Sequence, residues 1–428
     1  MTQNHWDAVI IGGGLAGLVS AAVLGKAGMK TLLLEKAKSA GGRAKTDIIS
    51  GQFFNIGPHA LYKKGRALPI LKELGIEING SAPKLGGLLM DCHHSFAAPF
   101  SPNGVLQSKL LNWKEKIEWI GILRRIQKLK PGQFSILTFQ QFVDETTQTP
   151  KIQKLLFTLG RLVSYSHAPE QISARVMLAH MQIGMGGVIY VDDGWQSIID
   201  QLYNQAVTNH VQIQTSANVK QLTALDNGQW QITVSNQEPI YCSNIIYSGP
   251  PQALNDLLGE SAKLPFNHFE PIKAAALDVA LSRLPNPENL FAMGIDAPYY
   301  YSVHSNYARL SKKGESTILH VLKYHHPDES IDATEEKRNL ENFLEVIQPG
   351  WQKYIITKRC LPQITVNGRL PMVNDTSLFT RSSAILPGLY AAGDWASPSF
   401  ILSEAAAESG KQAALEVIDK EMRIKHAN

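Results

Sequence analysis

The sequence predicts an α/β protein with two domains, the first of them a discontinuous Rossmann-type domain. Residues 7–11 form a short apolar run that ends in glycines, followed by a helical pattern from residue 15 to 28 and an apolar run at 31–34. Mostly helical patterns fill residues 83–189, and strand patterns return afterwards. At 428 residues the chain is too long for one ordinary core, so one domain is expected to interrupt the other.

The expected domain boundaries follow these changes of pattern. The first domain is predicted to consist of residues 1–83, 190–262 and 386–428. Within this domain we predict a helix over 194–209 and a closing helix over 403–423. Strands are predicted at 211–215, 219–225, 229–234, 240–247 and 388–392.

The second domain is predicted to be an α+β substrate domain made of residues 84–189 and 263–385. Pro150 and Pro169 are predicted to begin helices, because proline is favoured at the first helical position. Strands are expected at 275–281, 299–304 and 318–324, and a helix at 335–347.

Composition excludes several classes of protein. Hydrophobic residues make up 44% and charged residues 18% of the chain, which is typical of a globular enzyme and excludes a disordered or fibrous chain. The net charge of +4 is too small to favour nucleic acid as a partner. No apolar run reaches the roughly 18 residues of a spanning helix, and no export signal is seen.

The cysteines indicate the redox compartment. Cys92, Cys242 and Cys360 are an odd number and form no CxxC pair, so neither a disulfide framework nor a zinc site is predicted. We interpret them as reduced thiols, and we therefore expect a cytoplasmic protein without a metal site.

The glycine cluster has the spacing of a dinucleotide-binding turn. Gly12, Gly14 and Gly17 form GxGxxG between a strand and a helix, and Glu35 ends the next strand. The first two glycines allow a tight turn and a close approach to a pyrophosphate, the third lets helix and strand pack, and the acid accepts hydrogen bonds from ribose hydroxyls. These residues alone leave NAD and FAD open.

Three further segments favour FAD. Gly41, Gly42 and Arg43 follow Glu35, and near the C-terminus GLYAAGDWA, which contains Asp394, precedes SPSFILSEAAAESGKQAA. With these motifs the sequence resembles the FAD-dependent superfamily of amine oxidases, protoporphyrinogen oxidases and phytoene desaturases, nearest the phytoene desaturase-like branch. The resemblance implies a glutathione-reductase-like fold and an FAD bound without a covalent link.

The resemblance also implies roles for single residues. Arg43 would approach the pyrophosphate and flavin, and Asp394 would hold the ribityl or pyrophosphate region. The final helix would point its N-terminus at the flavin pyrimidine, with Leu402 and Ser403 supplying N–H groups that stabilise developing negative charge. The implied cofactor-binding residues are Gly12, Gly14, Ala16, Gly17, Glu35, Lys36, Gly42, Arg43, Gly57, Pro58, His59, Val219, Gly393, Asp394, Leu402 and Ser403.

One segment departs from the family pattern. In YVDDGW, residues 190–195, Asp192 and Asp193 replace the usual Pro-Gly, and we interpret both aspartates as solvated turn residues. Cys360 lies too far from Asp394 to match the cysteine that binds flavin covalently in some amine oxidases.

The implied reaction is dehydrogenation or isomerisation of an apolar substrate, such as an isoprenoid, by hydride transfer to flavin N5, with oxygen or a quinone as electron acceptor. Leu402 stands where an amine oxidase often places an aromatic ring, which counts against a simple amine oxidase. Two alternatives stay open: an amine or protoporphyrinogen-type oxidase that uses oxygen, and a flavin-binding partner protein without turnover.

No obligatory catalytic side chain is identified. Lys273 resembles a lysine that holds a water near N5 in amine-oxidising relatives, although a surface lysine is the plainer interpretation, and His59 is a second candidate. His304 and His320 lie in strand patterns and are candidate acids or bases. His325 and His326 precede a proline and are expected in an exposed turn. A tunnel for an apolar substrate could be lined by residues 275–281, Leu284, Phe291 and Met293.

Residues 108–130 have a basic amphipathic pattern. Such a helix either lies on an anionic membrane surface, or packs its apolar stripe inward and leaves its basic face in solvent. The sequence leaves peripheral membrane contact as an alternative.

Overall fold

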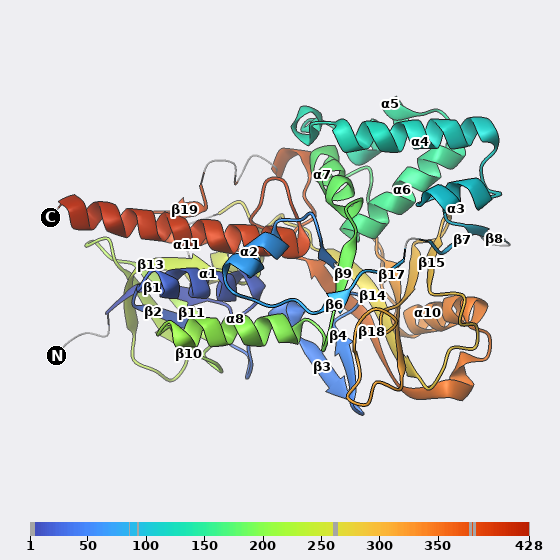
Figure 1. The fold of residues 1–428 in the computed structure, drawn as a ribbon. Helices are drawn as coiled ribbons and strands as arrows, with labels where there is room; N and C mark the ends of the chain where they lie inside the picture. Colours follow the sequence, from blue (N-terminus) through green and yellow to red (C-terminus); the bar gives the residue numbers. More distant parts are fainter. Residues whose placement is uncertain are drawn as a thin grey trace.

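The computed structural model describes residues 5–84, 86–91, 94–259, 264–375, 379 and 382–427. Two lobes lie side by side, with the ends of the chain in the first lobe and a group of helices above the second (Figure 1). This arrangement confirms the predicted α/β fold class.

The first lobe contains an eight-stranded sheet. Strand β1 (His5–Ile11) pairs in parallel with β2 (Thr31–Leu34) and β13 (Ile240–Tyr247). The other strands are β10 (Gln212–Gln214), β11 (Val219–Ala224), β12 (Trp230–Val234), β19 (Ala384–Leu386) and β20 (Leu389–Ala391). The central strands are apolar nearly throughout, because helices and loops cover both faces of a parallel sheet.

Helices α1 (Leu15–Lys26), α8 (Gln196–Thr208) and α11 (Leu402–Ala427) lie together on this sheet, as Figure 1 shows, with α2 (Ala67–Glu73) beside α11. Small residues let α1 and α11 approach closely. A Cβ atom at Gly410 would lie 2.4 Å from the backbone oxygen of Ala16, and Ser20 donates a hydrogen bond of 2.8 Å to the Gly410 oxygen. Helix α9 (Pro251–Leu258) packs near β11.

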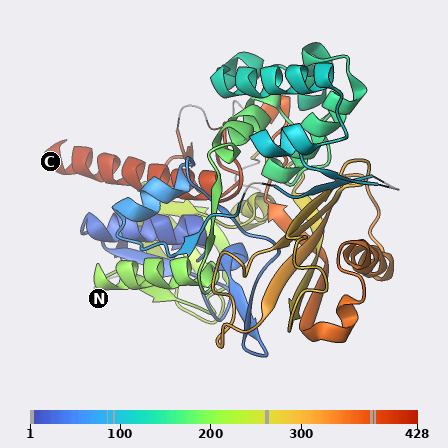
Figure 2. The same cartoon turned by 45° about the vertical axis from the view of Figure 1, so that its right-hand side comes forward.

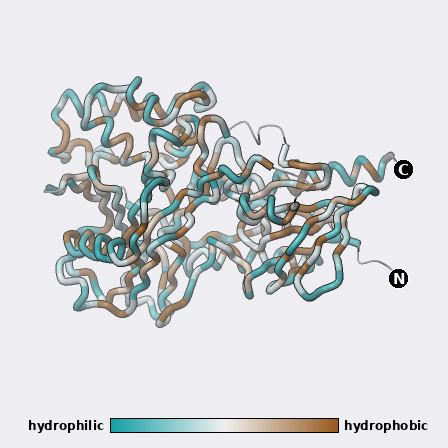
Figure 3. Tube along the Cα trace, turned by 180° about the vertical axis from the view of Figure 1, so that it is seen from behind, coloured by the Kyte–Doolittle hydropathy of each residue, from teal (hydrophilic) through white to brown (hydrophobic). Residues whose placement is uncertain are grey.

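The second lobe contains a seven-stranded sheet in the order β18-β14-β17-β16-β15-β7-β8. Its strands are β7 (Leu88–Met90), β8 (Ser95–Ala97), β14 (Ile272–Leu281), β15 (Phe291–Gly294), β16 (Tyr299–Val303), β17 (Thr317–Tyr324) and β18 (Ile355–Asn367). Helix α10 (Ala333–Ile347) covers one face, and hydropathy alternates along the helices in Figure 3, as expected where one face is buried.

The group of helices above this sheet is visible in Figure 2. It comprises α3 (Pro102–Gln107), α4 (Trp113–Lys128), α5 (Phe139–Thr146), α6 (Pro150–Ser164) and α7 (Ala174–Gly184). Pro150 begins α6, as predicted. The prediction for Pro169 was wrong: its carbonyl accepts a hydrogen bond from the backbone N–H of Gln140, the chain turns, and α7 begins only after Ser173.

Short strands connect the lobes. They are β3 (Thr46–Ile49) with β4 (Gln52–Asn55), and β5 (Leu61–Tyr62) and β6 (Gly80–Ser81), which both pair with β9 (Val188–Val191). Short 3₁₀ turns lie at Gly42–Ala44, Pro131–Phe134, Trp351–Tyr354 and Val373–Asp375. Among the described residues, no helix is long and apolar enough to span a membrane. Cys242 and Cys360 are free thiols, and Cys92 lies outside the described residues.

Candidate functional site

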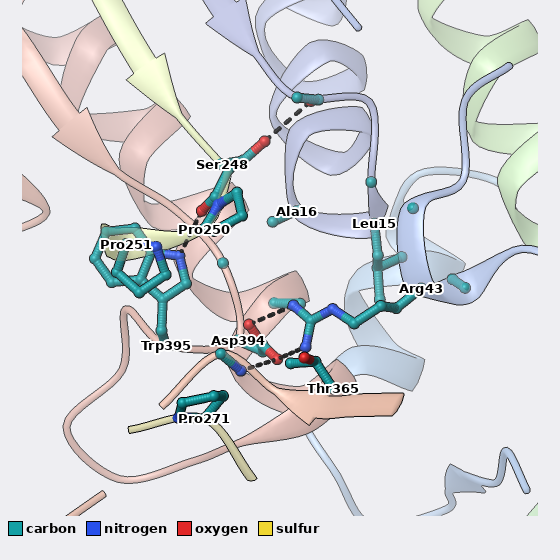
Figure 4. Close-up of a pocket in the computed structure, with 18 of the residues that line it drawn as sticks. Leu15, Ala16, Arg43, Ser248, Pro250, Pro251, Pro271, Thr365, Asp394 and Trp395 are labelled. Carbon is teal, nitrogen blue, oxygen red and sulfur yellow. Dashed lines mark hydrogen bonds and ion pairs between the residues drawn. The ribbon is translucent and has the colours of Figure 1, made fainter. Parts of the chain in front are cut away.

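A cavity of about 920 Å³ lies between the two lobes and is lined by both. Its lining comes from the β1–α1 turn, the ends of β2 and β13, the turn at Gly42, the segment from Ile56 to Ala60, the end of β18 and the start of α11. Figure 4 shows that lining residues from distant parts of the chain lie near one another, among them Leu15, Arg43, Thr365 and Asp394.

The N-terminus of α1 opens into this cavity. Gly14 is its N-cap, with φ −78° and no side chain to cap the helix, and a Cβ atom there would meet no protein atom within 4 Å. By contrast, a Cβ at Gly17 would lie 2.0 Å from the Gly12 oxygen. The first-turn N–H groups have no partner within the helix, so this end of α1 can bind an anion.

Glu35 is 8% exposed and lines the cavity next to this helix. Its two carboxylate oxygens accept hydrogen bonds from the backbone N–H groups of Gly13 at 2.6 Å and Ala37 at 2.7 Å. Each oxygen keeps a further lone pair, so the fixed carboxylate can accept hydrogen bonds from two hydroxyl groups of a ligand.

The Gly41–Gly42–Arg43 turn is hydrogen-bonded to the first glycine turn, because the Gly41 N–H donates to the Gly13 oxygen at 2.8 Å. Arg43 forms a two-pronged ion pair with Asp394, with Nη2 2.7 Å from Oδ1 and Nη1 bonded to Oδ2 (Figure 4). Asp394 also accepts the Gly368 N–H at 2.9 Å. Motifs from both ends of the chain therefore form one polar surface.

His59 lines the cavity with both ring nitrogens already in contact with backbone. Its Nδ1 lies 3.1 Å from the Gly57 oxygen, and its Nε2 lies 3.1 Å from the Arg43 oxygen. Burial lowers the pKa of His59, so the ring is neutral near pH 7 and donates only one of these bonds. Both nitrogens lie against backbone oxygens, and the single N–H of the ring binds one of the two loops.

The start of α11 also lines the cavity, through Leu402 and Ser403. Leu402 has φ +58°, and its N–H donates to Asn367 Oδ1 at 2.7 Å, so the expectation that this N–H is free for a ligand needs correction. Glu404 is fully buried. Its carboxylate accepts hydrogen bonds from the backbone N–H groups of Ala67, at 2.9 Å, and of Arg66, and so caps the N-terminus of α2. Burial raises the pKa of Glu404.

Most of the predicted cofactor residues meet at this cavity. The predicted residues that line it are Gly12, Gly14, Ala16, Glu35, Lys36, Gly42, Arg43, Pro58, His59, Val219, Gly393, Asp394, Leu402 and Ser403. Gly17 does not line it and instead allows α1 to pack on the turn. Gly57 does not line it either; its φ is +75°, and a Cβ there would lie 3.0 Å from Ile364.

The structure places Lys273 away from the large cavity. It lies on β14 and lines a small separate pocket with His325, His326 and Leu370. His325 is 3% exposed, so its prediction as an exposed turn residue was wrong. Its ring packs against the buried Glu336, 3.5 Å away.

Two other expectations also need correction. On β14, Ala275, Leu277, Val279 and Leu281 pack in the core beneath α10, and Leu284, Phe291 and Met293 do not line the large cavity either, so these residues do not form a tunnel. Asp192 and Asp193 are turn residues, but they are not merely solvated. The backbone N–H of Arg309 donates to Asp192, and its guanidinium donates to Asp193.

Several cavity residues belong to no recognisable motif. Tyr62, Tyr165, Leu322, Ile364 and Thr365 line the part of the cavity under the second sheet. Only the strand pattern at 318–324 could have indicated Leu322, and nothing local marks Tyr165 or Ile364. Among the described residues, no group of side chains could hold a metal ion, and the cavity lining includes no cysteine.

Comparison with known proteins identifies the family. Residues 15–418 match the family of flavin-containing amine oxidoreductases. The L-amino-acid oxidase of Echis ocellatus is 36% identical over 81 residues, which are 18% of this chain and 16% of that protein, so this match spans only a small part of either.

Solved structures share the fold. A double mutant of putrescine oxidase superposes with a TM-score of 0.77 at 13% identity, covering 97% of this chain and 100% of that one. Cyclohexylamine oxidase from Brevibacterium oxydans IH-35A gives 0.75 at 14%, covering 97% and 99%. A provisionally named protoporphyrinogen oxidase from Exiguobacterium sp. 255-15 gives 0.73 at 17%, covering 98% and 100%.

The family match covers nearly the whole chain and includes Arg43 and Asp394, which pair at the cavity. The family consists of flavin enzymes, which favours catalysis over a flavin-binding protein without turnover. The chain belongs to the flavin-containing amine oxidoreductase family and is an FAD-dependent oxidoreductase.

Proposed function

We propose that the cavity binds FAD without a covalent link and that the enzyme dehydrogenates or isomerises an apolar substrate, as phytoene desaturase-like proteins do. When bound, the flavin supplies a two-electron acceptor at N5. The observation that carries the proposal is the uncharged lining of the cavity under the second sheet.

The residues present fit the proposed cofactor. The α1 N-terminus with its open Gly14 can receive a pyrophosphate, and Glu35 can accept the adenosine ribose hydroxyls. Val219 lines the same end of the cavity and supports the proposed adenine contact. Non-covalent binding is supported because no cysteine lines the cavity among the described residues and both nitrogens of His59 already contact backbone oxygens.

The other end of the cavity supports an apolar substrate. The lining residues from β17 and β18 are Leu322, Ile364, Thr365 and Val366, none of them charged. Among the described lining residues the charged ones are Glu35, Lys36, Arg43 and Asp394 of the cofactor motifs and Glu270, which is exposed just before β14. A charged amine or carboxylate buried against this apolar surface would lack a counter-ion.

A second candidate function is an amine or protoporphyrinogen-type oxidase that uses oxygen. The names of the similar structures favour it, since two are amine oxidases and one is provisionally named a protoporphyrinogen oxidase. Leu402 in the cavity lining favours the apolar substrate over an amine.

An anaerobic titration separates the two candidates. The purified protein is mixed with carotenoid precursors, amines and porphyrinogens while the flavin absorbance band is recorded. We expect bleaching by a carotenoid precursor; bleaching by amines alone, with peroxide formed in air, contradicts the proposal. Flavin released by acid precipitation confirms non-covalent binding.

A charge placed in the cavity tests the apolar lining directly. Leu402→Asp suits φ +58° better than leucine and puts a carboxylate at a helix N-terminus, where it is tolerated. We expect it to slow reduction of the flavin by an apolar substrate more than tenfold. Ser399→Asp is the control, because Ser399 does not line the cavity. Equal rates for both variants contradict the proposal.

We also propose that helix α4 contacts an anionic membrane surface peripherally. Trp113 is 69% and Ile117 71% exposed on adjacent turns of α4, next to Leu106, which is 61% exposed. Exposed basic residues continue the same helix at Lys114, Arg124, Arg125 and Lys128. The apolar side chains would enter the interface and the cations would bind anionic headgroups.

Vesicle binding tests this contact. The wild type should co-sediment with vesicles containing phosphatidylglycerol, and replacing Trp113 and Ile117 with glutamate should abolish this. Replacing Val346 of α10, which is 64% exposed, with glutamate is the control. No binding by the wild type, or binding that survives the Trp113 and Ile117 changes, leaves α4 as an ordinary solvent-facing helix.

A further inference from the structure

The second lobe reaches the cofactor motifs through the end of strand β18 and the two residues after it, 366–369. The Val366 oxygen accepts a hydrogen bond from Arg43 Nη1 at 3.1 Å, and the Gly368 N–H donates to Asp394 Oδ2 at 2.9 Å. No motif in the sequence marks this segment. It nevertheless touches both partners of the ion pair that joins the two ends of the first lobe.

A buried cation anchors this strand end. The Arg369 side chain is 0% exposed, and its Nη2 donates to the Ser397 oxygen at 2.6 Å. Its guanidinium carbon lies 5.2 and 5.4 Å from the ring centres of Phe269 and Phe379. Burial lowers the pKa of Arg369 to about 10, so the side chain stays charged at pH 7. The strand end is thereby fixed to the chain that follows Asp394.

Asn367 lies inside this segment, behind the cavity lining, and is 0% exposed. Its Oδ1 accepts the Leu402 N–H at 2.7 Å. Its Nδ2 donates to the oxygens of Arg369 at 2.7 Å and Asp394 at 3.4 Å. Because the amide oxygen only accepts and the amide nitrogen only donates, these three partners fix the orientation of the side chain. Asn367 therefore joins the start of α11 and the turn at Asp394 to one strand end.

Leu402 has a backbone conformation that is rare for its side chain. Its φ is +58°, where a bulky side chain crowds the backbone. Such a conformation persists only where the surrounding contacts enforce it, and it is common at ligand sites. Leu402 lines the cavity, and the fully buried Asn367 binds its N–H. This contact is suited to hold the start of α11 in the unfavourable conformation.

The N–H groups that precede Leu402 are also bound by side chains. Ser397 Oγ accepts the N–H groups of residues 399 and 400 at 3.3 and 3.1 Å. Nε2 of His180, on α7 of the second lobe, accepts the Ile401 N–H at 3.0 Å. Burial lowers the pKa of His180 to about 3, so Nε2 remains an acceptor. The protein itself thus binds the N–H groups of residues 399–402.

Ser403 comes next, in the first turn of α11, and lines the cavity. The helical hydrogen bonds begin later, where the Ala405 N–H donates to the Ile401 oxygen at 3.2 Å. An N–H group in the first turn finds no acceptor within its own helix, and the helix end carries positive potential. The N–H of Ser403 is therefore available to a group bound in the cavity.

We propose that Asn367 is a positioning residue of the cofactor site. By binding the Leu402 N–H, it holds the start of α11 so that the Ser403 N–H faces the bound flavin. The inference rests on the proposed FAD site. An N–H group that is already oriented stabilises the negative charge that two-electron reduction adds to a flavin. Asn367 lies behind the lining, so it acts only through these backbone groups.

Asn367→Leu tests this role, because leucine has a similar volume and no polar atom. We expect the reduced flavin to bind at least tenfold more weakly relative to the oxidised flavin, which lowers the two-electron midpoint potential of the holoprotein by about 30 mV. Asn244→Leu is the matched control, since Asn244 is also 0% exposed and does not line the cavity. Its side chain makes three hydrogen bonds, to Asp7, Lys420 and Glu421. Both variants should lower the melting temperature, and only Asn367→Leu should change the potential.

Amide hydrogen exchange of the wild type gives a readout that needs neither a variant nor a substrate. In the apoprotein, the Leu402 amide should exchange as slowly as the amides of the core, and the Ser403 amide at least tenfold faster. Added FAD should then protect the Ser403 amide.

Several results overturn the inference. They are a Leu402 amide that exchanges as fast as that of Ser403, a Ser403 amide that bound FAD does not protect, and a wild-type potential in Asn367→Leu. An apoprotein that takes up no FAD contradicts the proposed function instead, and the exchange of Leu402 still decides whether Asn367 holds the start of the helix.

Discussion

Alanine substitutions at Gly14 and Gly17 should separate cofactor binding from folding, although the two glycines belong to one motif. A Cβ atom at Gly17 would lie 2.0 Å from the Gly12 backbone oxygen, which cannot move without opening the β1–α1 turn. A Cβ at Gly14 would meet no protein atom within 4 Å, and φ −78° suits alanine. That Cβ would point into the space proposed for the pyrophosphate.

The expected magnitudes differ accordingly. Overpacking costs about 1–3 kcal/mol, and a backbone clash belongs at the upper end of that range. At about 2–4 °C per kcal/mol for a domain of roughly 150–250 residues, Gly17→Ala should lower the melting temperature of the apoprotein by about 5–10 °C. Gly14→Ala should lower it less, because only the poorer N-cap preference of alanine acts there, and should lose one charge-assisted hydrogen bond of about 1.5–3 kcal/mol, which weakens FAD binding roughly 10- to 100-fold.

Differential scanning fluorimetry of the apoprotein and fluorescence titration with FAD measure the two quantities separately. Gly121→Ala is the control, because Gly121 lies exposed on α4 and a Cβ there meets no atom within 4 Å. It should raise helix stability by about 0.5–1 kcal/mol and leave FAD affinity unchanged. The reasoning is refuted if Gly14→Ala destabilises the apoprotein as much as Gly17→Ala, or binds FAD like the wild type.

Three further predictions concern single buried groups. Asp394→Ala leaves Arg43 without its partner and should abolish flavin retention during gel filtration, and a variant that stays yellow contradicts its role. Glu404→Ala leaves the first N–H groups of α2 unpaired and should cost about 1–3 kcal/mol in urea denaturation, whereas Glu404→Gln retains an acceptor and should cost less. Burial lowers the pKa of His180 from 6.5 to about 3, so the native ring stays neutral while the unfolded ring gains a proton. Stability should therefore fall as pH drops below 6.5, by up to about 1.4 kcal/mol per pH unit, and His180→Gln should flatten this slope between pH 6.5 and 4.5.

The cofactor half of the site could be predicted because local rules determine it. The bounds of β2 match the apolar run at 31–34, since a strand buried on both faces is apolar throughout, and those of β13 match the strand pattern at 240–247. The Gly12 turn, with φ +109°, and the approach of Gly17 to it demand glycine whatever the rest of the chain does. Such residues can be recognised in a single sequence.

The substrate half could not be predicted, because long-range pairing creates it. Strand β18 carries charged residues and Pro362, and its burial alternates only weakly, so no strand pattern was visible, yet it supplies Ile364 to Val366 of the cavity. The candidate bases His304 and His320 are buried and do not line the cavity. His320 bonds to Asp278, a contact that depends on the register between β14 and β17, which no local pattern reveals.

The helix predicted over residues 108–130 shows a second limit of prediction from sequence. The structure confirms α4 within it, and Trp119, Ile122 and Ile126 are buried against the neighbouring helices. The sequence pattern could not show that Trp113 and Ile117 stay outside that contact. An apolar side chain that packs inward and one that faces a membrane have the same helical periodicity.

The ion pair between Arg43 and Asp394 also has a consequence for the order of events during synthesis. The two residues are 351 positions apart, so a chain still growing on the ribosome carries its glycine turns long before it carries their partner. The ion pair therefore forms only after the last segment docks, so a chain that stops short of residue 394 lacks the partner of Arg43 at the cavity.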